Sequence, residues 1–123
     1  MAEYLPLHSP GQAFTRVASA AITAGNLLSV SGSGTVAPSA AADATVIGVA
    51  AFDTASGANV TVFAGGVQRL VAGTGGLTAG QFVHAGATGT VIAHTNGTTD
   101  YLIVGLALTT ATATNLVEVL MVR

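Results

Sequence analysis

Short apolar stretches separated by turn-forming residues run along most of the chain. Two of them, Asn59–Phe63 and Leu116–Leu120, alternate apolar and polar side chains, which is the spacing of a strand with one buried face. The stretches are rich in Val, Ile and Thr and are bounded by Gly, Asn and Asp, a pattern typical of an all-β domain. The predicted strands are Phe14–Ser19, Asn26–Val30, Thr35–Ala37, Thr45–Phe52, Asn59–Phe63, Gly66–Val71, Gln81–Ala85, Thr90–Ala93, Asp100–Leu108 and Leu116–Val122. The alanine-rich stretch Ser39–Ala44 is the one candidate for a short helix, with a loop as the alternative.

The chain contains an internal repeat, 22–67 and 77–122. Ile22-Thr23-Ala24-Gly25 in the first copy matches Leu77-Thr78-Ala79-Gly80 in the second, 55 residues later, and the offset is 57 after Val46. Two copies are too few for a solenoid, which needs at least about three units. We therefore expect a compact β-barrel or sandwich-like domain over residues 14–123, built from two pseudo-symmetric halves.

Residues 1–13 are predicted to form an extended N-terminal arm. Pro6 and Pro10 favour extended conformation in the residues before them. Tyr4, Leu5 and Leu7 place apolar side chains on this arm, which cannot bury them alone. The arm either packs on its own domain or lies on a neighbouring subunit, and the second arrangement is preferred.

Charge is scarce: 7% of the 123 residues are charged, against about 25% in an ordinary domain, and lysine is absent. The net charge of -2 gives no basic patch for nucleic acid. β proteins usually protect their strand edges with charged residues, so we infer that other subunits cover much of this surface. A surface rich in Thr, Ser and Gly that stays soluble without charge is the alternative.

The sequence predicts neither a membrane span nor a disulfide. Cysteine is absent, and the N-terminus lacks the basic and apolar regions of a signal peptide. The most apolar stretch, 101–122, is interrupted by four threonines, an asparagine and a glutamate, and it is better explained by two strands than by a membrane helix. We expect a soluble protein that no classical signal exports.

The candidate chemical groups are His84, His94 and Asp100, which could in principle bind a metal or form an acid–base site. Ser29 and Ser39 occupy the positions of the two histidines in the first copy, so the repeated scaffold does not require them. No local spacing offers a further ligand. We therefore interpret the histidines as surface or interface residues and predict no metal and no cofactor.

The glycine-rich and acidic segments are interpreted as loops. Ser31–Gly34 lacks the pattern of a nucleophilic serine elbow, and Gly73–Gly76 lacks the lysine of a phosphate-binding loop. The aspartates at 43, 53 and 100 lie in or beside predicted turns, where Asp is favoured. No enzyme is predicted.

The order of these motifs resembles the small capsid decoration, or head cement, proteins of tailed bacteriophages. The similarity covers most of residues 14–122 and rests on the two Thr-Ala-Gly turns, Ile47-Gly48-Val49-Ala50, Gly66-Val67 and Gly89-Thr90-Val91. One departure is Ile103-Val104-Gly105-Leu106-Ala107, where a valine is inserted into the family pattern.

This resemblance implies a structural virion protein, made in the host cytoplasm, that binds the outside of a phage head and stabilises the shell. Its implied partners are the major capsid protein and itself, as a homotrimer, with no nucleic acid and no membrane. The arm could add a strand to a sheet edge of the capsid. The predicted capsid or subunit interface is formed by Tyr4, Leu5, Leu7, His8, Phe14 and Arg16.

A carbohydrate- or cell-surface-binding β module of a virion or bacterial surface is the alternative function. Such sites usually present aromatic platforms. The chain has no tryptophan, and several of its six Phe and Tyr residues fall in predicted core strands. This second function is therefore the less favoured one.

Overall fold

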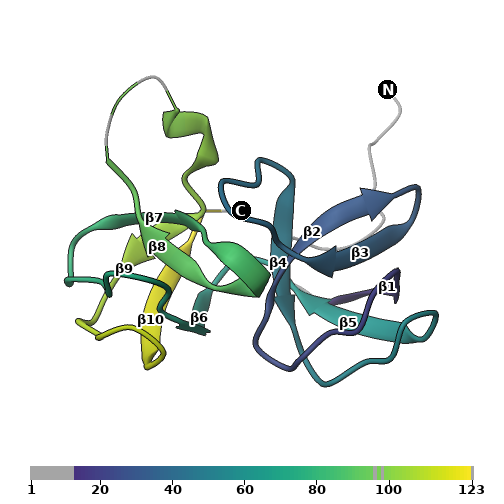
Figure 1. Ribbon diagram of the computed structural model, residues 1–123. Helices are drawn as coiled ribbons and strands as arrows, with labels where there is room; N and C mark the ends of the chain where they lie inside the picture. The colour runs from purple at the N-terminus through teal and green to yellow at the C-terminus, as the bar shows by residue number, and fades with distance from the viewer. Residues whose placement is uncertain (1–12, 96, 98, 123) are drawn as a thin grey trace, which may run out of the picture.

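The computed structural model describes residues 13–95, 97 and 99–122 and is all-β. Two β units lie side by side, one formed by the first half of the chain and one by the second (Figure 1). The predicted arm, apart from Ala13, lies outside the described residues.

Ten strands and two short 3₁₀ turns make up the described chain. The strands are β1 (Phe14–Ala18), β2 (Leu27–Gly32), β3 (Thr35–Pro38), β4 (Val46–Ala50), β5 (Asn59–Phe63), β6 (Val67–Val71), β7 (Phe82–Ala85), β8 (Val91–Ala93), β9 (Gly105–Ala107) and β10 (Leu116–Met121). The 3₁₀ turns are η1 (Ala87–Gly89) and η2 (Asp100–Leu102).

The first unit is a closed barrel with strand order β1-β3-β2-β4-β5. β1 closes it by pairing antiparallel with β5 and parallel with β3. The barrel encloses a core of small and branched side chains: Ala18, Ile22, Leu28, Val36, Ala50, Val60 and Val62. Closure removes the free strand edges that the low charge of the sequence would leave exposed.

The second unit is a five-stranded sheet with order β6-β10-β9-β7-β8. A single parallel bridge between Ala72 and Val91 joins its two ends, at the place where β1 and β3 pair in the first unit. The five strands of each unit therefore pair in the same sequence order. The registers also correspond, because Leu27 opposes Val49 as Phe82 opposes Leu106.

The two Thr-Ala-Gly turns have one geometry. The Asn26 N–H donates to the Thr23 carbonyl (3.0 Å), and the Gln81 N–H donates to the Thr78 carbonyl (3.1 Å). Gly25 and Gly80 have φ of 83° and 91°, as the third position of a type II turn requires. In each turn the side-chain amide oxygen of the last residue accepts the threonine N–H, at 2.9 Å and 2.8 Å.

A second buried cluster joins the two units. It contains Leu27, Val46 and Val49 of the first unit together with the core side chains of the second. Backbone hydrogen bonds cross at the same place, from the Ala42 N–H to the Ala85 carbonyl (2.9 Å) and from the Gly89 N–H to the Ser39 carbonyl (3.0 Å). The first and second halves of the chain are thus packed against each other through buried apolar side chains.

The all-β prediction is confirmed, with two differences in detail. Asp100–Leu108 is not one strand: it begins with η2, and only Gly105–Ala107 pairs as β9. Ser39–Ala44 is loop rather than helix. Its Asp43 carboxylate accepts the Thr45 N–H (2.9 Å) and hydroxyl (2.8 Å), which fixes a turn where a helix could have continued.

Candidate interaction surface

Phe14 and Arg16 come together on β1. The Arg16 guanidinium lies 4.9 Å from the centre of the Phe14 ring, and its Nη1 donates to the Thr15 carbonyl (2.9 Å). Phe14 is half-buried against the core of the first barrel, so part of its ring has a structural role. The other four predicted interface residues, Tyr4, Leu5, Leu7 and His8, lie outside the described residues.

A row of apolar side chains crosses the outer face of the second sheet. Val67, Leu120, Leu106 and Phe82 oppose one another across β6, β10, β9 and β7. Directly paired residues point to the same face of a sheet, so the four form one continuous row. Val67, Leu120 and Phe82 are 55%, 43% and 42% exposed. We call these four residues the apolar row.

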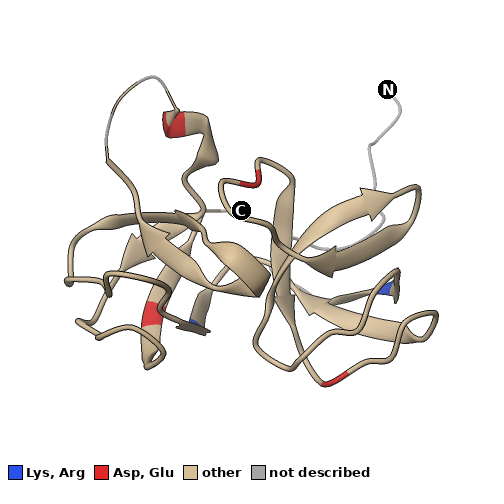
Figure 2. Cartoon of the chain, in the orientation of Figure 1, with Lys and Arg blue, Asp and Glu red and all other residues tan. Residues whose placement is uncertain are grey.

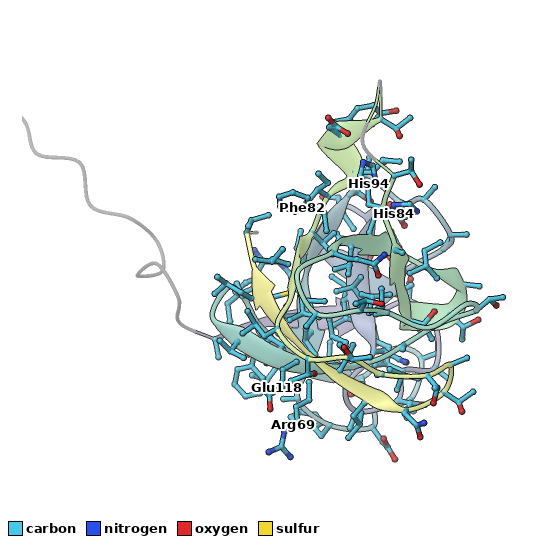
Figure 3. The ribbon with its side chains drawn as sticks, turned by 90° about the vertical axis from the view of Figure 1, so that its left-hand side faces the viewer. Arg69, Phe82, His84, His94 and Glu118 are labelled. Carbon is cyan, nitrogen blue, oxygen red and sulfur yellow. The ribbon has the colours of Figure 1, made fainter. Side chains whose placement is uncertain are left out.

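Arg69 and Glu118 flank the apolar row. They oppose each other across β6 and β10, two pairs along from Val67 and Leu120 and therefore on the same face. Together with Thr109, Leu116 and Val117 they line a shallow depression on this half of the molecule. Figure 3 looks at this half, with Arg69 and Glu118 near one end and Phe82 near the other.

Charge is sparse over the whole described surface. Figure 2 shows isolated charged residues separated by long uncharged stretches of both units. Among residues 13–95, 97 and 99–122, the one contact at ion-pair distance is the hydrogen bond between His94 and Asp100. Eleven large hydrophobic side chains are exposed on the same described surface. This surface is suited to contacts that bury neutral area rather than to binding a charged ligand.

His84, His94 and Asp100 lie close together beside strands β7 and β8, at the edge of the second sheet. Both histidines are labelled in Figure 3. His84 Nδ1 lies 2.8 Å from His94 Nδ1, and His94 Nε2 lies 2.9 Å from an Asp100 carboxylate oxygen. The carboxylate can only accept, so His94 Nε2 carries a proton. When His94 is neutral, its Nδ1 must therefore accept the hydrogen of His84 Nδ1.

Burial and neighbours shift the pKa values in this cluster. The pKa of His84 is lowered from 6.5, first by desolvation and then by the nearby His94. The pKa of Asp100 is lowered from 3.8, chiefly by its hydrogen bond to His94 and then by the backbone N–H of Gly97. Both shifts favour the state in which His84 is neutral and Asp100 is charged.

This arrangement orients side chains and offers little for catalysis. The side chain of His94 is only 1% exposed, and its Nδ1 faces another imidazole instead of a hydroxyl or thiol. Within the part of the chain that the structure describes, no cluster of His, Cys, Asp or Glu could hold a metal ion. Both histidines were interpreted as surface or interface residues, and His94 is not a surface residue, because its side chain is buried and hydrogen-bonded to Asp100 of η2.

The aromatic side chains are more exposed than the sequence suggested. Phe52, Phe63, Phe82 and Tyr101 are between 42% and 65% exposed, and of the aromatics that the structure describes only Phe14 packs against a core cluster. Phe14, Phe63 and Phe82 do lie in strands, as expected, but each occupies an outward or terminal position. No helix in the described chain has the length and apolarity to cross a lipid bilayer.

Sequence reasoning missed the apolar row, although a signal for it was available. Leu116–Met121 reads as alternating, yet both of its faces are apolar: Val117, Val119 and Met121 are buried, and Leu116 and Leu120 are exposed. An apolar residue on each face of a strand indicates a second covered surface. The pairing that aligns Leu120 with Val67, Leu106 and Phe82 could not be read from the sequence.

Two comparisons with known proteins match the chain. The sequence model of a family described as phage cement protein matches residues 8–122. The fold is similar to the crystal structure of the head fiber gp8.5 N base of bacteriophage phi29, with a TM-score of 0.69 and 19% identity over 89% of this chain and 92% of that chain. No curated protein sequence matches the chain.

Proposed function

Because the chain belongs to the phage cement protein family, we propose that it binds the outer face of the major capsid protein and braces the shell as a homotrimer. The family membership and the structural role in capsid decoration, expected from the resemblance, are confirmed. The chain is thus a virion protein that binds the phage capsid. The identity of the capsid partner and the trimer are the finer parts of the proposal.

One observation supports the proposal above the others, namely the neutral, partly apolar surface of a folded β scaffold. The exposed hydrophobics lie on both units, and charged residues are few and scattered. A protein that stabilises a shell by mass action needs large interfaces that are buried only after assembly. Uncharged surface is the least costly kind to bury in such an interface.

We propose that residues 14–123 act as a single unit composed of the repeat 22–67 and 77–122. The shared buried cluster around Leu27, Val46 and Val49 supports this, because separating the halves would expose it. The identical pairing order of the two sheets supports a duplication.

The proposed capsid or subunit interface comprises the arm, residues 1–13, followed by Phe14 and Arg16. The stacked pair on β1 stands where the chain enters the barrel, so it would fix the direction in which the arm leaves. Tyr4, Leu5, Leu7 and His8 would then contact the capsid or the adjacent subunit.

A structural rather than catalytic role is part of the proposal. The one acid–base cluster places His94 out of contact with solvent and hydrogen-bonds it to His84 and Asp100. Replacing Asp100 by Asn should therefore leave head binding unchanged. A loss of head stabilisation in a folded Asp100→Asn variant would contradict this.

The test is reconstitution on heads that lack the protein. The full chain should co-sediment with such heads and raise the temperature at which they release DNA. A variant without residues 2–13 should fold with the same circular dichroism spectrum and fail to co-sediment. Full binding by that variant would refute the proposed role of the arm, and no binding by the full chain would refute the capsid role.

A further inference from the structure

The apolar row has a counterpart in the first unit, and the side chains of the two rows differ in how far they are exposed to solvent. In the first unit Leu27, Val49 and Phe63 oppose one another across β2, β4 and β5, in the register that Phe82, Leu106 and Leu120 show in the second. Leu27 and Val49 are 0% and 4% exposed, whereas Phe82 is 42% exposed. Phe63 is 43% exposed, so in the first unit only the Leu27 and Val49 part of this row is covered.

The second unit covers the Leu27 and Val49 part of the row of the first. Leu27 and Val49 belong to the buried cluster that contains the core of the second unit. The turn η1 lies against the start of β2, where Asn26 Nδ2 donates to the Thr88 carbonyl at 3.4 Å. The approach is close, because a Cβ on Gly89 would lie 2.8 Å from the Cβ of Asn26.

The first unit carries its own equivalent of η1. Ser33 and Gly34 form the turn between β2 and β3, as η1 lies between β7 and β8. Gly34 has φ of 74° and Gly89 has φ of 73°, so the two turns match at this glycine, whereas Thr88 has φ of 54° and its counterpart Ser33 has no positive φ. A Cβ on Gly34 would meet nothing within 4 Å, and the neighbouring Val30 is 49% exposed.

The free turn and the open row cannot meet within one chain. The β2–β3 turn lies at one end of the molecule, and the start of β7 lies at the other (Figure 1). Each molecule therefore has the β2–β3 turn of its first unit at one end. At the other end it has the Phe82 end of the apolar row, which nothing in the described chain covers.

We propose that copies of the chain associate head to tail, with the first unit of one copy covering Phe82 and Leu106 of the next and its Ser33–Gly34 turn lying against Gln81. The contact repeats between chains the one that the second unit makes within a chain, where its core covers Leu27 and Val49 and η1 lies against Asn26. It is heterologous, so a set of copies closes into a ring when the rotation allows. This inference rests on the self-association in the proposed function and assigns its two surfaces.

A cysteine pair tests the contact directly, because the chain has no cysteine of its own. Gln81 is the counterpart of Asn26, and Ser33 is the counterpart of Thr88. A chain with Ser33→Cys and Gln81→Cys should form disulfide-linked oligomers on mild oxidation. The control carries Gln81→Cys with Ser56→Cys, an exposed residue of the β4–β5 loop, and should remain monomeric on a non-reducing gel.

A matched pair of phenylalanines tests the row. Phe82 and Phe63 lie on strands and are 42% and 43% exposed, but only Phe82 would be covered in the head-to-tail contact. Phe82→Thr should raise the dissociation constant for self-association about tenfold or more, measured by analytical ultracentrifugation, since an aromatic anchor is lost. Phe63→Thr should change it by less than about threefold.

The outcomes separate this contact from the capsid role. A chain that binds heads but gives no Ser33–Gln81 cross-link, free or on heads, overturns the head-to-tail contact and leaves the capsid role in place. Reduced head binding by Phe82→Thr with unchanged self-association also overturns it, because the capsid would then be the occupant of the row. Cross-linked rings that bind no heads support the contact and refute the capsid role.

Discussion

Gly105 lies in β9, where the paired strand β10 leaves no room for a side chain. A Cβ on this residue of β9 would be 2.5 Å from the Leu120 carbonyl oxygen and 2.6 Å from Val119 Cγ1. Gly48 of β4 meets the same obstruction, with the Phe63 oxygen at 2.4 Å and Val62 Cγ1 at 2.7 Å. In each case the nearest atom belongs to the backbone of the paired strand, so a methyl group can be accommodated only if a strand moves.

Two opposing effects decide the result of Gly105→Ala. Removing glycine restricts the unfolded chain and by itself stabilises by about 0.4–1 kcal/mol where the site is unstrained. Overpacking a well-packed interior typically costs about 1–3 kcal/mol. The steric effect is larger, so we expect a net loss of about 1–2 kcal/mol in the free energy of unfolding. For a domain of this size that corresponds to a fall in Tm of roughly 5–10 °C.

Thermal and urea unfolding followed by circular dichroism measure this loss. Gly97→Ala is the control, because a Cβ on Gly97 would meet nothing within 4 Å, and its stability should stay within about 0.5 kcal/mol of the parent. Gly105→Ala and Gly48→Ala should both lose stability with unchanged m-values. A Gly105→Ala variant as stable as Gly97→Ala would refute the steric argument.

Three further predictions concern the interior, the turns and pH. Leu28→Ala should lower the free energy of unfolding by about 2–5 kcal/mol in urea titrations, since Leu28 is fully buried in the first barrel. Asn26→Ala should lose about 1 kcal/mol by the same assay, since it leaves the Thr23 N–H without its side-chain acceptor. Acidification should lower the free energy of unfolding in two separate pH ranges. The lowered pKa of His84 makes the unfolded state bind the proton first, so stability falls below about pH 6.5. The lowered pKa values of Asp43 and Asp100 make stability fall again below about pH 3.8, and Asp100→Asn should reduce the fall in that second range without abolishing it, as measured in Tm–pH profiles.

The strands could be predicted from the sequence because their signals are local. Asn59–Phe63 was predicted with its observed bounds, and most other strand ends differ by one or two residues. Val and Thr on alternating positions, with Gly between them, are sufficient for such assignments. The family could also be recognised, because its motifs are turns such as Thr23–Asn26, whose glycine is required by a positive φ.

The candidate surface could not be predicted, because it depends on contacts between distant residues. The closure of the barrel needs the pairing of β1 with β3 and β5. The burial of His94 depends on η2, which occupies a segment that was expected to be strand. The exposed row depends on the registers of four strands, and a shift of one residue would have turned it inward.

The outer face of the second sheet also differs chemically from its counterpart in the first unit. Arg69 and Glu118 oppose each other where the first unit pairs Thr15 with Thr61. On the same face, His84 follows Phe82 by two residues along β7, at the position that Ser29 holds on β2.

These differences between the two copies leave the shared strand order and registers unchanged, so the fold does not depend on them. They lie on the face that carries the exposed Phe82 and Leu120. A repeated fold needs its core positions in both copies, whereas it can change a face that meets different partners. The differences therefore fall on the face that carries the apolar row, and this neutral row, with Arg69 and Glu118 beside it, is the part of the face best suited to contact another protein chain.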